Sequence, residues 1–148
     1  MSINVYSKSD HWVGRTLSNW ADTPFIGKIG NGGYIRFQCV ESWWLCFKSG
    51  KSIEECLKLK WNNLHGWESK HLMRNVSCVR KVTPEILKKV YILKLNQNPI
   101  VKQALLDSGD ENFDHYYVYN NKIIKCPKYL WTATLWAELR SELRSELR

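Results

Sequence analysis

The spacing of apolar residues divides the chain into a strand-forming first part and a helical remainder. Before residue 40, short apolar stretches alternate with glycines, and the clearest alternation of apolar and polar positions is Tyr34–Gln38. A period of two predicts short strands and turns over this part. From Val40 the apolar residues recur every three or four positions as far as Ser49 and Gly50. This pattern predicts a helix that ends at a glycine.

Two later segments carry clear signals for the start of a helix. Ser52, with Glu55 three residues later, has the pattern of a capping box and predicts a second helix through about Trp61. Thr83 before Pro84 predicts a third start, because threonine caps helices and proline fits the first turn. This helix is expected to end near residue 98, before a proline. Its expected apolar stripe is Ile86, Val90 and Leu93.

The remaining part of the chain predicts two helices separated by a hairpin. A helix over residues 100–107 is expected to end at Ser108 and Gly109. The aromatic, strand-forming segment Phe113–Tyr119 can pair with Lys122–Cys126 across the turn at residues 120–121, where two asparagines stand. Pro127 then begins the final helix.

A tetrapeptide repeat, Ser-Glu-Leu-Arg, occupies residues 138–148. Leucines four apart from Leu135 to Leu147 form one narrow apolar stripe. Two interpretations stay open. The stripe can contact a partner helix, or the repeat is a slipped duplication or an added segment that only lengthens an exposed helix, since four is not a coiled-coil period. We therefore expect a domain over residues 1–137 and a helical extension over 138–148.

Composition narrows the class of protein. The 148 residues, 44% of them hydrophobic, are enough for one domain with a core. No basic stretch followed by an apolar run opens the chain, so we expect a cytoplasmic protein without a membrane anchor. Five scattered cysteines without a Cys-x-x-Cys pair predict reduced, mostly buried thiols, and neither a metal nor a cofactor is expected. The net charge of +8 favours an anionic partner, although solubility alone also explains it.

Glu41 and Lys48 are the most suggestive pair of charged residues. They stand seven residues apart on the helix that begins at Val40, so they share a face and are separated by about 10 Å of rise. They cannot pair directly, but they can close on a small ligand with Trp44 between them as an aromatic floor. Alternatively, both charges are solvated on the outer side of an amphipathic helix whose core face is Val40, Trp43 and Phe47.

Short motifs, taken in order from about residue 13 to 131, resemble those of the NADAR family. Its Ser-Asn-aromatic segment is similar to Leu17–Trp20 followed by Pro24-Phe25. Its E-x-x-aromatic-x-x-x-K helix is similar to Val40–Trp44 with Lys48. Leu72–Val76 resembles the family's L-G-R-x-V element, Lys94–Pro99 resembles its K-F-x-Q-N-P element, and Leu105–Asp110 resembles its L-L-x-T-G-D element.

The resemblance implies a fold and a chemistry. The fold is a compact, α+β, mainly helical NADAR-like single domain with a few short strands. Characterised members act on N-ribosyl bonds: some remove ADP-ribose from guanine in DNA or related nucleic acid, and others cleave a riboflavin-pathway intermediate. Lys48 would form a Schiff base with the opened ribose, and Glu41 would act as the acid/base group. Ligand contacts would come from Ser18, Asn19, Trp20, Trp44, Arg74 and Trp131.

The chain departs from the family pattern in its last part. The D-x-x-W-G-x-G segment is replaced by Lys128–Ala133, in which Trp131 alone matches, and Met73 replaces the L-G-R glycine. Three functions therefore stay open. The first is a glycosidase that strips ADP-ribose from guanine in nucleic acid. The second is a non-catalytic binder that counters a DarT-type DNA ADP-ribosyltransferase toxin, as in large tailed phages, and the third is a riboflavin-pathway N-glycosidase. In a phage-encoded protein the cytoplasm would be the host bacterium's.

Overall fold

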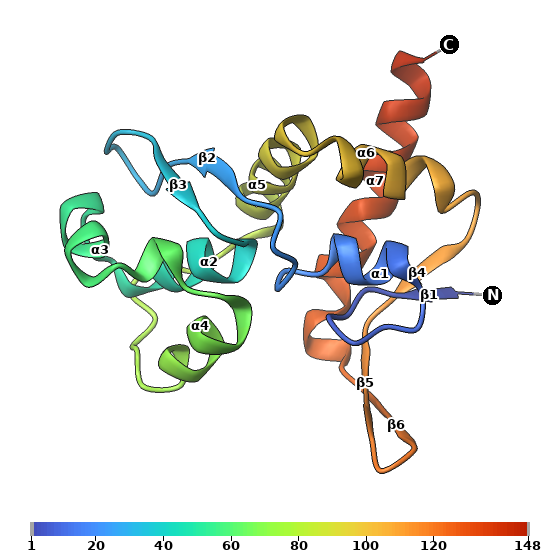
Figure 1. Cartoon of the computed structure of the whole chain (residues 1–148), viewed down its shortest axis with the longest axis horizontal. Coiled ribbons are helices and arrows are strands. Elements are labelled where there is room, and N and C mark those ends of the chain that lie inside the picture. The colour runs from blue at the N-terminus through green and yellow to red at the C-terminus, as the bar shows by residue number, and fades with distance from the viewer. Residues whose placement is uncertain (1, 148) are drawn as a thin grey trace. The chain divides into compact units, whose positions relative to one another are not determined.

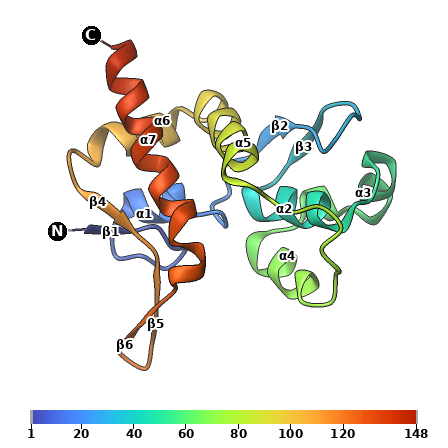
Figure 2. The same cartoon turned by 180° about the vertical axis from the view of Figure 1, so that it is seen from behind.

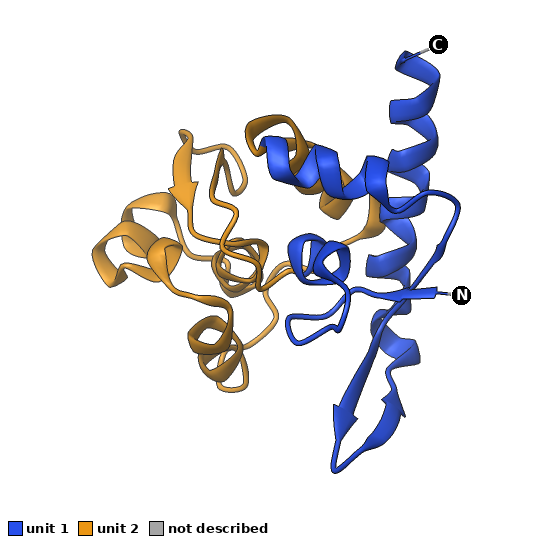
Figure 3. Cartoon of the chain, turned by 45° about the vertical axis from the view of Figure 1, so that its right-hand side comes forward, with its two compact units in different colours: residues 1–18, 99–148 blue, residues 19–98 orange. Residues whose placement is uncertain are grey.

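A computed structural model describes residues 2–147 of the chain (Figure 1). The predicted fold class is confirmed: the described part is α+β and mainly helical, and its strands are short and form two-stranded sheets. The chain divides into two compact units, which we call unit 1 (residues 1–18 and 99–148) and unit 2 (residues 19–98) (Figure 3). Within residues 2–147, no helix has both the length and the apolar character that a bilayer crossing requires.

Unit 2 is assembled around one helix, α2. In chain order its elements are β2 (Phe25–Gly27), β3 (Ile35–Phe37), α2 (Val40–Ser49), α3 (Ile53–Leu59), α4 (Gly66–Met73) and α5 (Pro84–Gln97), with a single 3-10 turn at Trp61–Asn63. Strands β2 and β3 pair antiparallel, with Phe25 opposite Phe37. Helix α2 packs against both α4 and α5, and α5 also packs against β2 (Figure 2).

Helix α2 is buried over most of its circumference. The expected core residues Val40, Trp43 and Phe47 are buried, but so are Glu41, Ser42, Leu45 and Cys46. The helix ends as predicted at Gly50, whose φ of 74° is a conformation that other residues rarely adopt. A side chain there would also lie 2.5 Å from Val79. A helix surrounded in this way is a core element, and any polar side chain on it has to be accommodated inside the protein.

Unit 1 is built from the first and the last segments of the chain. Its elements are β1 (Ser2–Asn4), α1 (Trp12–Leu17), α6 (Pro99–Asp107), β4 (Asn112–Asp114), β5 (Tyr116–Tyr119), β6 (Lys122–Lys125), a 3-10 turn at Pro127–Tyr129 and α7 (Leu130–Glu146). Strands β1 and β4 pair parallel, and α1 packs against α6. The indole nitrogen of Trp136 on α7 donates to the Leu17 carbonyl at 3.1 Å. This bond ties the last helix to the end of the first.

The local signals for caps and turns are confirmed. The Ser52 hydroxyl accepts from the Glu55 amide, and the Glu55 carboxylate accepts from the Ser52 amide, both at 3.2 Å. The Thr83 hydroxyl accepts from the third residue of α5 at 3.3 Å. Asn120 and Asn121 both have positive φ and connect β5 to β6, as a two-residue hairpin turn requires. Helix α3 ends at Leu59, slightly before the predicted end at Trp61.

Three features differ from the prediction. The first part of the chain was expected to form strands and turns, but it contains the helix α1, in which Gly14 is required because a side chain there would lie 2.0 Å from the Asn4 carbonyl. Helix α4 was not predicted. On α5 the buried residues are Leu87, Val90, Tyr91, Lys94 and Leu95, whereas Ile86 and Leu93 are half-buried. In each case contacts with distant segments decide the outcome.

The terminal repeat is part of the core of unit 1. Helix α7 runs through residues 137 and 138 without interruption and contacts β4 and α6. Leu139 and Leu143 are 2% and 8% exposed, whereas Leu147 is 59% exposed. The buried Arg140 donates to the Ser108 hydroxyl at 2.9 Å and to the Glu111 carbonyl at 2.8 Å. The interpretation that the repeat only lengthens an exposed helix is therefore wrong for its first two leucines.

Two leucines at the same position of the repeat should differ in their contribution to stability. Leu139→Ala removes a buried side chain, so we expect it to lower the free energy of unfolding by about 2–5 kcal/mol. Leu147→Ala is the matched control and should change it by less than about 0.5 kcal/mol, because that side chain is already largely in water. Urea unfolding of the three proteins measures both values. Equal effects would contradict the packing of the repeat.

Candidate functional site

Helix α2 carries Glu41 in its first turn and Lys48 in its last. The alternative in which both charges are solvated on the outer side of the helix is wrong for Glu41, which is only 7% exposed, whereas Lys48 is half-buried. Trp44, one turn from each, is also half-buried. The three residues expected from spacing to form one face are thus held inside or at the margin of unit 2.

The carboxyl of Glu41 lies in an environment that favours its neutral form. Burial raises its pKa from 4.5 to about 7, although the positive charges of Lys70 and then Lys48 act in the opposite direction. The carboxyl therefore exchanges its proton near neutral pH. Such a group can both donate and accept a proton during a reaction, which is the property of a general acid/base.

Lys48 is positioned by the end of α4. Its Nζ donates to the Met73 carbonyl at 3.1 Å. Carbonyl groups at the end of a helix lack partners within the helix, and the helix dipole also favours a cation there. Helix α4 therefore acts on both residues of α2: its Lys70 places a positive charge near Glu41, and its last residue binds the amine of Lys48.

Asn19 is held at the beginning of α2. Its carbonyl accepts from the Glu41 amide at 2.9 Å, and its side-chain oxygen accepts from the Tyr91 hydroxyl at 2.7 Å. Tyr91 is almost completely buried on α5. The predicted ligand residue Asn19 is thus directly next to the predicted acid, and Tyr91 is a positioning residue that the sequence analysis did not identify.

Trp20 packs on the first turn of α4. A side chain at Gly66 would lie 2.4 Å from the Trp20 ring, so only glycine allows this contact. Arg74 follows Met73 at the other end of α4 and is exposed, so its guanidinium is accessible to a ligand. The two predicted ligand residues therefore stand at opposite ends of the helix that positions Lys48.

The remaining two predicted contacts belong to unit 1. Ser18 is buried at the end of α1, where its amide donates to the Gly14 carbonyl at 3.1 Å. Trp131 is half-buried in the first turn of α7. The other six, Glu41, Lys48, Asn19, Trp20, Trp44 and Arg74, all belong to unit 2. The catalytic and ligand-binding roles of all eight residues stay predictions.

A second buried lysine was missed as a candidate. Lys94 on α5 is fully buried, and burial lowers its pKa to about 7, while the nearby Cys39 thiol acts to raise it. The sequence does indicate its burial, because Leu87, Tyr91 and Lys94 are spaced by four and then three residues, as on the buried face of a helix. Fully buried lysines are rare, so a lysine within such a stripe is a candidate for a functional role.

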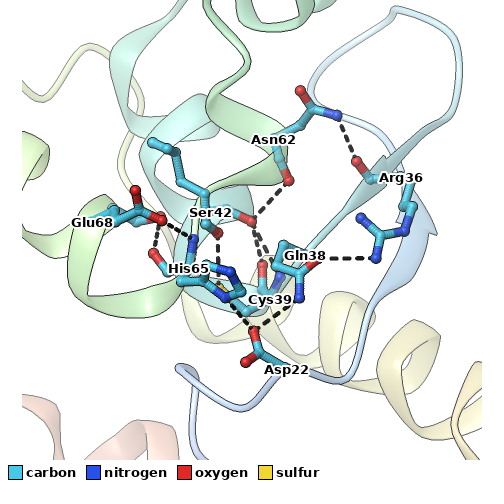
Figure 4. Close-up of polar contacts among 10 residues, drawn as sticks. Asp22, Arg36, Gln38, Cys39, Ser42, Asn62, His65 and Glu68 are labelled. Carbon is cyan, nitrogen blue, oxygen red and sulfur yellow. Dashed lines mark hydrogen bonds and ion pairs between the residues drawn. The ribbon is translucent and has the colours of Figure 1, made fainter.

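A polar network sets the starts of α2 and α4 (Figure 4). Asp22 accepts from the Gln38 side chain at 2.9 Å and is 2.9 Å from Nδ1 of His65, whose pKa it raises. The Glu68 carboxylate accepts from the His65 amide at 3.0 Å, at the start of α4. Ser42 donates to the Cys39 carbonyl at 2.8 Å, at the start of α2. These bonds fix the helix termini that carry the site.

Comparison with known proteins adds no relative. No protein-family model matches the chain, and none of the curated proteins or solved structures compared with it is similar. Within residues 2–147, no three His, Cys, Asp or Glu side chains gather as a metal site would require. A function can therefore be argued only from the geometry of unit 2 and the order of the motifs.

Glu41→Gln should change how stability depends on pH. The folded state binds the Glu41 proton more tightly than the unfolded chain does, so wild-type stability should fall, relative to the variant, as pH rises from 4.5 to about 7. The difference between these two pKa values predicts that, above pH 8, the wild type has lost roughly 3 kcal/mol of unfolding free energy relative to the variant. Urea unfolding of both proteins between pH 4 and pH 8.5 measures it. A difference that does not vary with pH would contradict the burial of this carboxyl.

Proposed function

We propose that this protein removes ADP-ribose from guanine in nucleic acid by cleaving the N-glycosidic bond, as a NADAR-like protein that counters a DarT-type DNA ADP-ribosyltransferase toxin. The observation that carries the proposal is the buried Glu41 carboxyl, whose pKa is raised to about 7, on the same helix face as Lys48. Glu41 is buried and Lys48 is half-buried, so neither is fully solvated at the surface. Their arrangement supports acid/base and nucleophilic roles at one small site.

The reaction can be written with both groups in defined roles. The Lys48 amine, after it has lost a proton to water, attacks the anomeric carbon of the ribose, and the bond from that carbon to the guanine nitrogen breaks as Glu41 donates a proton to the leaving base. The bond from the anomeric carbon to the ring oxygen then breaks, a proton passes from the attacking nitrogen to that oxygen, and a protonated Schiff base with Lys48 forms. Glu41, now a carboxylate, accepts a proton from water, which hydrolyses the Schiff base. The net reaction consumes one water and releases ADP-ribose and unmodified guanine in the nucleic acid.

Neighbouring residues supply the recognition that this chemistry needs. Trp44 offers an aromatic surface between Glu41 and Lys48. Arg74 is exposed one residue after the carbonyl that holds Lys48, and its forked guanidinium suits the pyrophosphate of ADP-ribose. The net charge of +8 suits a polyanionic substrate better than a small metabolite.

Release of ADP-ribose from ADP-ribosylated DNA tests the proposal. We expect the wild-type protein to release it and Lys48→Ala to be slower by at least about 100-fold, the lower limit for a group that takes part directly in proton transfer or bond making. Lys58→Ala is the matched control, because it removes an exposed lysine from α3, and it should retain the wild-type rate. No release at high protein concentration would refute the proposal. Faster cleavage of the free pyrimidine nucleotide of the riboflavin pathway would assign that reaction instead.

A specific contact supports a second candidate, a non-catalytic binder of the toxin or of its modified DNA. The Lys48 amine donates to the Met73 carbonyl, which is a structural role as well as a possible resting position. Protection of cells from a DarT-type toxin separates the two functions. Loss of protection in Lys48→Ala, with an unchanged unfolding midpoint, indicates chemistry, whereas full protection by that variant indicates binding.

A further inference from the structure

Helix α4 exposes a tryptophan. Trp67 is 64% exposed, whereas the other seven tryptophans of the chain are buried or half-buried. Single exposed apolar side chains are common on proteins, so the exposure of Trp67 alone does not indicate binding. An indole does offer a flat surface with a polar edge, and the residues beside Trp67 decide what that surface suits.

The residues around Trp67 form one face of the helix. His71 and Arg74 follow Trp67 by four and then three positions, so the three side chains share a side of α4, and both are exposed. The buried residues Gly66, Ser69 and Met73 lie on the opposite side. We call the exposed residues Trp67, His71 and Arg74 the α4 face.

The chemistry of the α4 face suits an anion that carries flat rings. Arg74 is cationic and Lys70 borders the face, while the acidic Glu68 is turned to the start of the helix, where it accepts from the His65 amide at 3.0 Å. Proteins that bind single-stranded nucleic acid use such a combination of residues: the bases stack on exposed aromatic rings, and the phosphates interact with cationic side chains. A duplex is less suitable, because its stacked bases do not offer an open ring face.

The α4 face lies on the helix that positions the site. The same helix supplies the Lys70 charge that acts on Glu41 and the Met73 carbonyl that binds Lys48. We propose that Trp67 stacks on an unpaired nucleobase next to the modified guanine, so that the strand follows α4 past His71 towards Arg74. This inference rests on the proposed function for the identity of the modified base. The binding of a single strand by α4 can be tested without it.

Binding of an unmodified, labelled single-stranded DNA 12-mer, measured by fluorescence anisotropy at fixed salt, tests the α4 face. We expect Trp67→Ala to weaken binding about 5- to 100-fold and Trp67→Phe to retain most of it, because a base stacks on either ring. Tyr34→Ala is the control, since Tyr34 is also 64% exposed and belongs to the same unit, and it should bind like the wild type. Equal loss in both alanine variants, no loss in Trp67→Ala, or preference for duplex would overturn the inference.

Kinetics separate this inference from the proposed function. With ADP-ribosylated single-stranded DNA, Trp67→Ala should raise KM while kcat changes little, and with ADP-ribosylated guanosine it should match the wild type. If the wild type cleaves both substrates and the variant equals it on both, the α4 face is not a strand-binding surface although the function stands. If the wild type cleaves neither, the proposed function fails, and the anisotropy result alone decides the inference.

Discussion

Burial of the Glu41 carboxyl is the constraint on which the rest of unit 2 depends. A carboxylate inside a protein is unfavourable unless it is neutralised or paired, and here both occur in part: burial raises the pKa of Glu41 to about 7, while Lys70 and Lys48 counter that rise. Its amide is bonded to Asn19, which Tyr91 holds in turn. An aliphatic residue would pack in the first turn of α2 at less cost. A titratable group at this position fits the proposed chemistry, in which Glu41 transfers a proton.

Helix α4 contributes a charge and a carbonyl to the site, and it also carries residues exposed at the protein surface. It is short and has little apolar surface of its own, and its start depends on Trp20 packing against Gly66 and on Glu68 bonding to the His65 amide. Its end accepts the Lys48 amine. One face of α4, with Gly66, Ser69 and Met73, is buried where the helix packs on α2, and the opposite face lies in water. One element therefore binds the Lys48 amine and also exposes Trp67, the residue that we propose stacks on a nucleobase.

The sequence predicted those features that depend on neighbours along the chain. The cap at Thr83, the glycine at the end of α2 and the shared face of Glu41 and Lys48 all follow from local geometry and are confirmed. Features that depend on distant contacts were missed. Periodicity places Glu41 and Lys48 on one face but cannot say whether that face is inside or outside. It also gives no sign of α4, whose stability comes from packing, or of Leu139 as a core residue of unit 1. The roles of all the candidate site residues in binding and catalysis remain predictions.

The proposed reaction requires that Lys48 form a covalent Schiff base with the sugar while Glu41 transfers the proton. Sodium borohydride reduces such a bond to a stable amine. Incubating the protein with ADP-ribosylated DNA and borohydride, followed by intact-mass and peptide mass spectrometry, should therefore show ADP-ribose attached to Lys48. The adduct should be absent in Lys48→Ala and present in Lys58→Ala. Release of ADP-ribose without any adduct, or an adduct on another lysine such as Lys94, would contradict the claim.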